Sequence, residues 1–161
     1  MLDTKMVDEF LGSRCLYPEL EEVLKRHTKP LNNIVYRGMP CPYPIIKVGS
    51  LIRQWNGATH WSLDKNIAES FTTDYINEEY AEEMEAEFGI PSNKLFVRLI
   101  MVLDKCDKVV ELYHYSKDFV HEKEVTILGY DFEITDIIDK TDDMITVKVK
   151  AVERTEDDFV F

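Results

Sequence analysis

The chain of 161 residues has few cysteines, glycines and prolines, and it lacks a long apolar run. Its three cysteines, Cys15, Cys41 and Cys106, are an odd number at wide spacings, so we expect no disulfide framework and a reducing compartment. No apolar stretch approaches the roughly 18 residues that a membrane span needs. The N-terminal stretch MLDTKMVDEFLGSRC carries acids early and does not resemble a secretory signal. These absences predict a cytoplasmic protein.

Basic residues are also scarce. The 19 lysines and arginines face 31 aspartates and glutamates, which gives a net charge of −12. This charge repels a phosphate backbone at long range, which disfavours nucleic acid as the main partner and suits a basic protein target. The acids concentrate in Asn77–Glu87 and Glu153–Asp158. We interpret both segments as solvated surface, with target recognition by the first as the alternative.

Apolar periodicity predicts helices first and strands later. Helical spacing covers Asp3–Leu11, Pro18–Arg26, Asn66–Phe71 with Asp64 as its cap, and Glu78–Phe88. Strand-like runs cover Asn33–Arg37, Ala58–Ser62, Leu95–Leu103, Lys108–Leu112, Glu122–Leu128, Asp131–Ile138 and Met144–Val152. Proline makes Met39–Pro44 an irregular loop, and Asn56-Gly57 reads as a turn. The length and this order predict a single domain over residues 1–161 with an α+β fold.

The acid pair in Glu-Lys-Glu at positions 122–124 leads directly into a β-branched run. On a strand, Glu122, Glu124 and Thr126 share one face, while Val125 and Ile127 point to the other. A face with two acids, backed by an apolar face, suits an active-site cleft on a sheet. A solvated strand edge is the alternative.

Two segments upstream carry further polar groups. Arg37 ends a short strand and Gly38 follows it, so a guanidinium fork could hold a phosphate or carboxylate where the backbone is open to close approach. Ser62 ends another strand before a helix, so its hydroxyl could point into a cleft or cap the helix. An ordinary surface arginine and a simple capping serine are the alternatives.

In this order and spacing, the three segments resemble the Arg–Ser–Glu class of mono-ADP-ribosyltransferases, of the Glu-X-Glu type. The matching places are Val35-Tyr36-Arg37-Gly38, His60-Trp61-Ser62 with Ala68 and Phe71, and Glu122-Lys123-Glu124. The middle motif departs from the family pattern, because His60-Trp61 stands in place of Ser-Thr. The resemblance, which covers about Asn33–Ile138, implies an ADP-ribosyltransferase-like fold with two packed, mostly antiparallel sheets around an NAD cleft and with N-terminal helices.

The resemblance also implies the chemistry, which is cleavage of the nicotinamide–ribose bond of NAD and transfer of ADP-ribose. Glu124 would stabilise the positive charge that develops on the ribose, and Ser62 would orient Glu124. Arg37 would clamp the phosphates, and Gly38 would hold the nicotinamide amide. The implied NAD site comprises Arg37, Gly38, His60, Trp61, Ser62, Phe71 and Glu124, although His60 and Trp61 could equally be structural.

For the acceptor, the resemblance implies a protein arginine. Glu122 would lie about 6–7 Å from Glu124 along the strand, where its carboxylate could orient a guanidinium and remove a proton. The loop Tyr113–His121 would present the target. Its aromatic residues Tyr113, Tyr115 and Phe119 either contact the substrate or pack in the protein.

Other functions are compatible with the same residues. Water as the acceptor would make the protein an NAD glycohydrolase, and a nucleic-acid acceptor would make it a nucleic-acid ADP-ribosyltransferase. A non-catalytic acidic binding or inhibitor protein would leave Arg37, Ser62 and Glu124 unexplained as a set. The histidines and cysteines have no zinc-type spacing, so we expect no metal site. A compact acidic transferase suits a phage-encoded enzyme or a bacterial effector acting in the cytoplasm of a host cell.

Overall fold

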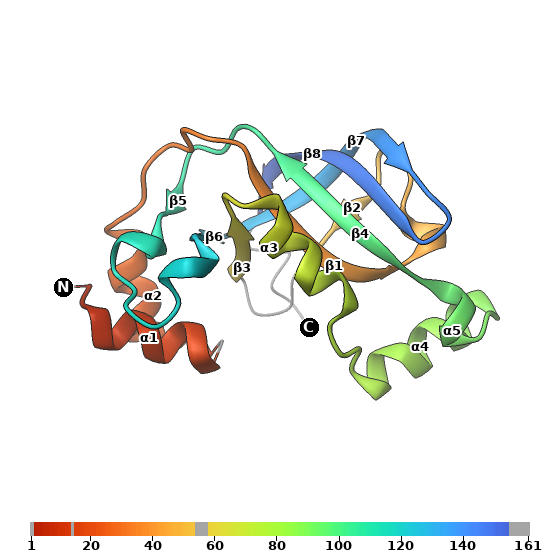
Figure 1. Cartoon of the computed structure of the whole chain (residues 1–161), viewed down its shortest axis with the longest axis horizontal. Helices are drawn as coiled ribbons and strands as arrows, with labels where there is room; N and C mark the ends of the chain where they lie inside the picture. The colour runs from red at the N-terminus through yellow and green to blue at the C-terminus, as the bar shows by residue number, and fades with distance from the viewer. Residues whose placement is uncertain (1, 14, 54–57, 155–161) are drawn as a thin grey trace.

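The computed structural model describes residues 2–13, 15–53 and 58–154 (Figure 1). The helices are α1 (Thr4–Ser13), α2 (Pro18–Lys25), α3 (Lys65–Ser70), α4 (Glu78–Phe88) and α5 (Ser92–Leu95). The strands are β1 (Val35–Pro42), β2 (Leu51–Ile52), β3 (Ala58–Ser62), β4 (Phe96–Leu103), β5 (Val109–Val110), β6 (Glu124–Leu128), β7 (Tyr130–Lys140) and β8 (Met144–Glu153). The expected turn at Asn56-Gly57 and the acidic tail beyond Arg154 lie outside the described residues.

The strands within the described ranges form one eight-stranded sheet in the order β2-β7-β8-β4-β1-β3-β6-β5. The β4–β8 pair is parallel and the other pairs are antiparallel. The register between β1 and β3 consists of a single pair, Tyr36 and Ser62. The expected α+β class is therefore confirmed. The two sheets that we expected are joined into one by the single β1–β3 pair.

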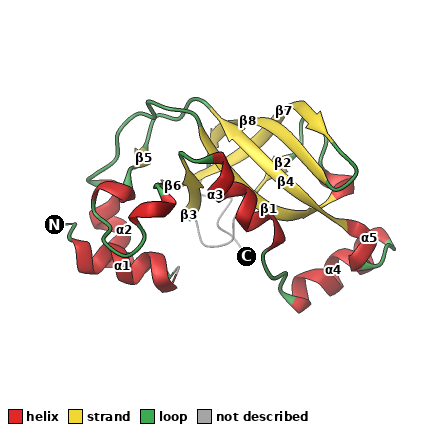
Figure 2. Cartoon of the chain, in the orientation of Figure 1, coloured by secondary structure: helices red, strands yellow, loops and turns green. Residues whose placement is uncertain are grey.

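Two apolar clusters stabilise the two parts of the sheet. The larger cluster lies among the long strands and includes Trp61 and Phe132, whose ring centroids are 4.8 Å apart. The second joins α1 and α2 to the β5–β6 end and includes Phe10 and Leu24. Each fully buried side chain of this size contributes roughly 1.5–3 kcal/mol. Figure 2 shows α1 and α2 at this end of the molecule and α4 and α5 at the other.

Helix limits follow the local sequence signals. The predicted cap of α3 is confirmed, because the Asp64 carboxylate accepts a hydrogen bond from the Asn66 N–H at 2.9 Å. The predicted limits of α4 are those of the structure, with Asn77 at its start and Gly89 in the left-handed conformation at its end. No helix in the described part of the chain is long and apolar enough to cross a bilayer.

The prediction that the strand ends at Arg37 and gives way to a loop is wrong. β1 continues through Pro40 to Pro42, paired with β4 along its whole length. The other edge of β1 meets β3 only at Tyr36. N–H groups alternate along a strand, so the nitrogens of residues 36, 40 and 42 face that same edge, where the prolines interrupt no ladder.

Candidate active site

A pocket of about 200 Å³ lies where β1, β3 and β6 meet beside α3. It is lined by all the residues expected at the NAD site and by the second acid, namely Arg37, Gly38, His60, Trp61, Ser62, Phe71, Glu122 and Glu124. Tyr36, Ala68 and Asp74 complete the lining. The fold thus brings the three predicted segments to one place.

The carboxylate of Glu124 is held at the first residue of β6. The residue is only 4% exposed. Its Oε2 lies 2.9 Å from His60 Nδ1 and accepts a hydrogen bond from Thr126 Oγ1, also at 2.9 Å. An ionised carboxylate only accepts hydrogen bonds, so Nδ1 is the donor in this pair. The predicted common face of Glu124 and Thr126 is confirmed, and Val125 lies in the core.

His60 links Glu124 to Arg37. Its ring contacts the carboxylate, while its backbone carbonyl accepts a hydrogen bond from Arg37 Nη1 at 3.2 Å. The ring of Phe10, from α1, lies 5.4 Å away between centroids. Nε2 is buried, and no hydrogen-bond partner for it occurs among the described residues. The sequence identified His60 only as a cofactor contact or structural residue, because its pairing with Glu124 depends on the β3–β6 register.

The hydroxyl of Ser62 contacts the backbone at two places, Glu122 and Asp64. It donates to the Glu122 carbonyl at 2.6 Å and accepts from the Asp64 N–H at 3.0 Å. A serine hydroxyl has one proton, and here that proton goes to Glu122. The Glu124 carboxylate itself contacts His60 and Thr126, and the role expected of Ser62, which is to orient Glu124, stays a prediction.

The prediction that Glu122 lies on the strand with Glu124 is wrong. Glu122 ends a 3-10 turn, Val120–Glu122, in which its N–H bonds to the Phe119 carbonyl at 3.0 Å. Lys123 then adopts a left-handed conformation with φ of 48°, which reverses the chain before β6 begins. Strand alternation therefore does not relate the two acids, although both residues line the pocket.

Gly38 permits close contact between β1 and α3. A Cβ atom at this position would lie 1.7 Å from the Ala68 carbonyl oxygen. Backbone cannot yield that much, so any larger residue would displace α3. The glycine expected to let a ligand approach thus lets a helix approach, on the wall of the same pocket.

Trp61 is a core residue, in agreement with the structural alternative. It is 2% exposed, and its indole N–H donates to Thr59 Oγ1 at 2.8 Å. Alternation along β3 directs Trp61 away from the face that carries His60 and Ser62. Its side chain therefore packs in the core, although the residue also belongs to the pocket lining.

Comparison with known proteins identifies the fold. No protein-family model matches the sequence, and no curated protein sequence matches it. The ADP-ribosyltransferase Vis, solved with agmatine, is similar with a TM-score of 0.64 and 14% identity over 92% of this chain and 73% of that chain. The chain has the fold of the ADP-ribosyltransferases. Another structure of Vis, a toxin from Vibrio splendidus, gives a TM-score of 0.59 and 14% identity. The match covers 84% of the present chain but only 58% of the length of the Vis chain.

A third structure with the ADP-ribosyltransferase fold comes from another bacterium. Exoenzyme S from Pseudomonas aeruginosa, solved with human 14-3-3 protein beta and bound to Carba-NAD, gives a TM-score of 0.52. The identity is 8% over 89% of this chain and 64% of that chain. At sequence identities of 8–14%, these similarities show that the chain shares the fold of these proteins.

The three aromatic residues expected to contact the target lie outside the pocket and pack within the ADP-ribosyltransferase fold. The Tyr113 hydroxyl donates to Glu111 at 2.8 Å. Tyr115 and Phe119 pack against the N-terminal cluster, and the rings of Tyr115 and His27 form a T-shaped pair with centroids 6.0 Å apart. Of the two alternatives given for these residues, packing is the one that these contacts support.

Asp8 of α1 forms hydrogen bonds with the loop that precedes Glu122 and Glu124. Its carboxylate accepts hydrogen bonds from Ser116 Oγ at 2.7 Å and from the N–H groups of Lys117 and Asp118 at 3.1 and 3.3 Å. The bond from Ser116, supported by the two backbone donors, lowers the pKa of Asp8. No sequence signal identified Asp8, because its partners lie more than 100 residues away.

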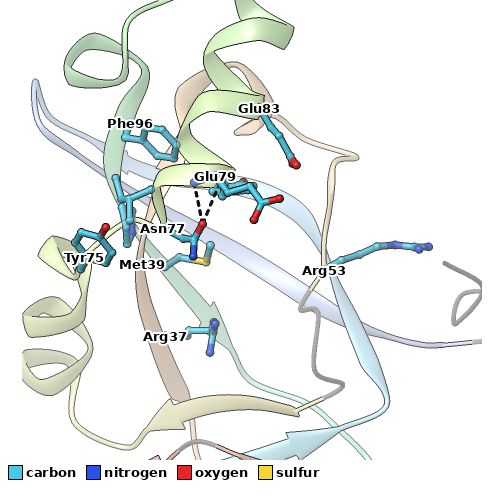
Figure 3. Close-up of a pocket in the computed structure, with 11 residues that line it drawn as sticks. Arg37, Met39, Arg53, Tyr75, Asn77, Glu79, Glu83 and Phe96 are labelled. Atoms are coloured by element: carbon cyan, nitrogen blue, oxygen red, sulfur yellow. Dashed lines mark hydrogen bonds between the residues drawn. The ribbon is translucent and has the colours of Figure 1, made fainter.

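A second, larger pocket of about 560 Å³ adjoins the first in this ADP-ribosyltransferase fold, because Arg37 lines both (Figure 3). Its walls come from β1, β4 and the start of α4. The lining comprises Arg37, Met39, Pro40, Arg53, Tyr75, Ile76, Asn77, Glu79, Tyr80, Glu83 and Phe96. The sequence analysis missed this pocket. Across the described ranges, no group of three or more histidine, cysteine or acidic side chains is arranged to hold a metal ion.

Proposed function

We propose that the chain is a mono-ADP-ribosyltransferase that cleaves NAD and transfers ADP-ribose to an arginine of a protein target. The observation that carries this proposal is the Glu124 carboxylate, nearly buried and held by two donors, in one pocket with Arg37 and Glu122. The ADP-ribosyltransferase fold supports it. A toxin among the structural neighbours supports action as a toxin or effector.

The proposed reaction exchanges one C–N bond for another. The bond between the ribose C1′ and nicotinamide breaks, and its electron pair leaves with nicotinamide. Positive charge develops on the ribose, as in glycoside cleavage, and Glu124 stabilises it as a preorganised anion. A guanidinium nitrogen of the target then bonds to C1′ and gives a proton to Glu122.

The surrounding residues have positioning roles. His60 and Thr126 orient the Glu124 carboxylate through the two bonds at 2.9 Å. Ser62 holds the turn that carries Glu122 through its bond to that carbonyl. Arg37 binds the phosphates, since a guanidinium fork matches phosphate oxygens. Residues Gly38 and Phe71 form the wall against which nicotinamide packs.

Several observations favour arginine as the acceptor. A guanidinium is a poor nucleophile while charged, so a carboxylate beside it is needed to accept the proton, and Glu122 lines the pocket with Glu124. Vis was solved with agmatine, which carries the guanidinium group of arginine. The net charge of −12 favours a basic protein over nucleic acid.

The experiment is incubation of the purified protein with labelled NAD and a bacterial lysate, beside a Glu124→Gln control. The proposal predicts label on protease-sensitive material only with the unaltered protein. Nuclease-sensitive label would instead indicate a nucleic-acid acceptor, and nicotinamide release without label would indicate a glycohydrolase. Absence of both products would contradict the proposal and favour a binding protein.

A further inference from the structure

We infer that Lys123, the residue between the two acids, is a positioning residue whose left-handed backbone places Glu122 for the transfer step and leaves Glu124 undisturbed. This inference rests on the proposed function and deepens it. The residue type at position 123 then controls transfer to the acceptor, whereas cleavage of NAD does not depend on it.

The first step is the backbone of Lys123. Its φ of 48° and ψ of 49° lie in the left-handed region. Within the described ranges, the other residues with positive φ are Gly49, Gly89 and Gly129, which lack a Cβ atom and adopt this region readily. A residue with a side chain is uncommon there, and strained backbones of this kind cluster at functional sites. In the described part of the chain, the strained residue thus lies between the two acids.

The second step is what holds this conformation. The peptide group that joins Glu122 to Lys123 is fixed at both ends. Its carbonyl accepts a hydrogen bond from Ser62 Oγ at 2.6 Å, and its N–H donates to the Val120 carbonyl at 3.2 Å. On the other side of the Cα atom, the Lys123 carbonyl accepts from the Leu63 N–H at 3.3 Å. Because both peptide groups are held, the dihedral angles of Lys123 have little freedom to relax.

The third step is the different support of the two acids. Glu124 begins β6 and pairs with Ser62 across the sheet. Its carboxylate contacts His60 and Thr126, each at 2.9 Å, so its position does not depend on the turn. Glu122 lies in the turn itself, so its placement in the pocket lining follows from the left-handed residue after it. A change confined to the turn should therefore displace Glu122 alone.

The fourth step is the exposure of Lys123. Because the residue is exposed, a substitution there changes the backbone preference and removes little packing. Glycine and asparagine adopt the left-handed region more readily than other residues, whereas a β-branched residue such as valine is a genuine outlier there. Asparagine and valine both remove the positive charge of lysine. The two substitutions at this position therefore separate the effect of the backbone from the effect of the charge.

The experiment compares Lys123→Val with Lys123→Asn. Lys105→Val is the matched control, because Lys105 is an exposed lysine whose φ is not positive. Agmatine modification and nicotinamide release are measured in parallel for each variant. We expect Lys123→Val to lower kcat for modification about tenfold, as small misplacements of catalytic groups do, with nicotinamide release and KM for NAD nearly unchanged.

The variants that keep the turn should keep the activity. We expect Lys123→Asn, Lys123→Gly and Lys105→Val to modify agmatine nearly as fast as the unaltered protein. A general loss of stability would lower both activities together, and urea unfolding of each variant detects it. Equal transfer by Lys123→Val and Lys123→Asn, or an equal fall of transfer and cleavage after Lys123→Val, would overturn the inference.

A binding measurement separates this inference from the proposed reaction. Titration of agmatine into Glu124→Gln by calorimetry requires no catalysis, and we expect binding that an added Lys123→Val weakens and an added Lys123→Asn does not. Transfer by the unaltered protein without any difference between these two substitutions would reject the positioning role alone. Agmatine binding that shows this difference, without NAD cleavage by the unaltered protein, would reject the proposed reaction alone.

Discussion

At the scale of single residues, His60 joins two charged residues of the candidate site, Glu124 and Arg37. Its Nδ1 bonds to Glu124, and its backbone carbonyl bonds to Arg37. One residue therefore holds the proposed catalytic anion and the proposed phosphate ligand at a fixed separation. A positioned donor of this kind sets the direction of a carboxylate without contacting the substrate.

The Nδ1 contact predicts different outcomes for three substitutions. In His60→Asn the amide nitrogen lies close to the Nδ1 position, whereas in His60→Gln it lies one bond farther out, and His60→Ala has no donor. We expect His60→Ala and His60→Gln to lower kcat for nicotinamide release about a hundredfold, as small misplacements of catalytic groups do, with KM for NAD little changed. His60→Asn should recover much of the loss. Equal loss in all three variants would contradict the positioning role.

At the scale of elements, α1 stabilises the loop that leads to Glu122. Asp8 accepts three hydrogen bonds from residues 116–118, and the Phe119 N–H bonds to Ser116 Oγ at 2.9 Å. The Phe119 carbonyl then accepts from the Glu122 N–H. The position of Glu122 thus depends on a helix at the start of the chain.

Asp8→Ala should therefore affect transfer more than cleavage. Because the loop loses its anchor, we expect transfer to agmatine to fall about tenfold, with nicotinamide release nearly unchanged. Asp3→Ala is the matched control, because Asp3 caps the same helix at Met6 without contacting the loop. The two activities are measured in parallel for both variants, and an equal fall in both after Asp8→Ala would rule out a selective effect on Glu122.

Elements with strong local signals could be predicted from the sequence, and elements set by neighbours could not. Residues 78–88 carry a cap, helical spacing and a terminal glycine, and the helix has those limits. Three prolines, Pro40, Pro42 and Pro44, indicated a loop, but β1 runs on to Pro42. Along residues 37–42 its second edge pairs with no strand of the described ranges, so the prolines are tolerated there. Glu122 leaves the strand because Ser62, distant in sequence, fixes its carbonyl in a turn.

At the scale of the whole molecule, the order of the three motif segments along the chain was enough to predict that they form one site. The three motif segments converge because they lie on β1, β3 and the start of β6, next to one another in the sheet. The contacts of His60, the anchor at Asp8 and the larger pocket depend on tertiary packing between distant segments. Residue types alone therefore gave no signal for them.

Folding stability should fall in alkaline solution, in part through a buried thiol. Burial raises the pKa of Cys41 to about 12 from an ordinary 9.0, so the folded chain keeps a proton that the unfolded chain loses. The stabilisation is complete below pH 9.0 and declines as pH rises toward 12, with a slope approaching about 1.4 kcal/mol per pH unit for this group.

Urea unfolding between pH 9 and 11, with a reductant present, measures this slope. We expect Cys41→Ala to be less stable overall but to show a shallower decline with pH. Cys15→Ala is the control, because Cys15 is an exposed free thiol. An unchanged slope in Cys41→Ala would show that other groups cause the alkaline loss.

The most direct test of the central claim is a parallel assay of nicotinamide release and agmatine modification by mass spectrometry, for the unaltered protein, Glu124→Gln and Glu122→Gln. We predict that Glu124→Gln lowers both activities by at least about a hundredfold, since it removes the anion next to the ribose. Glu122→Gln should abolish modification of agmatine and retain nicotinamide release. Undiminished release by Glu124→Gln would contradict the assignment of this pocket as the catalytic site.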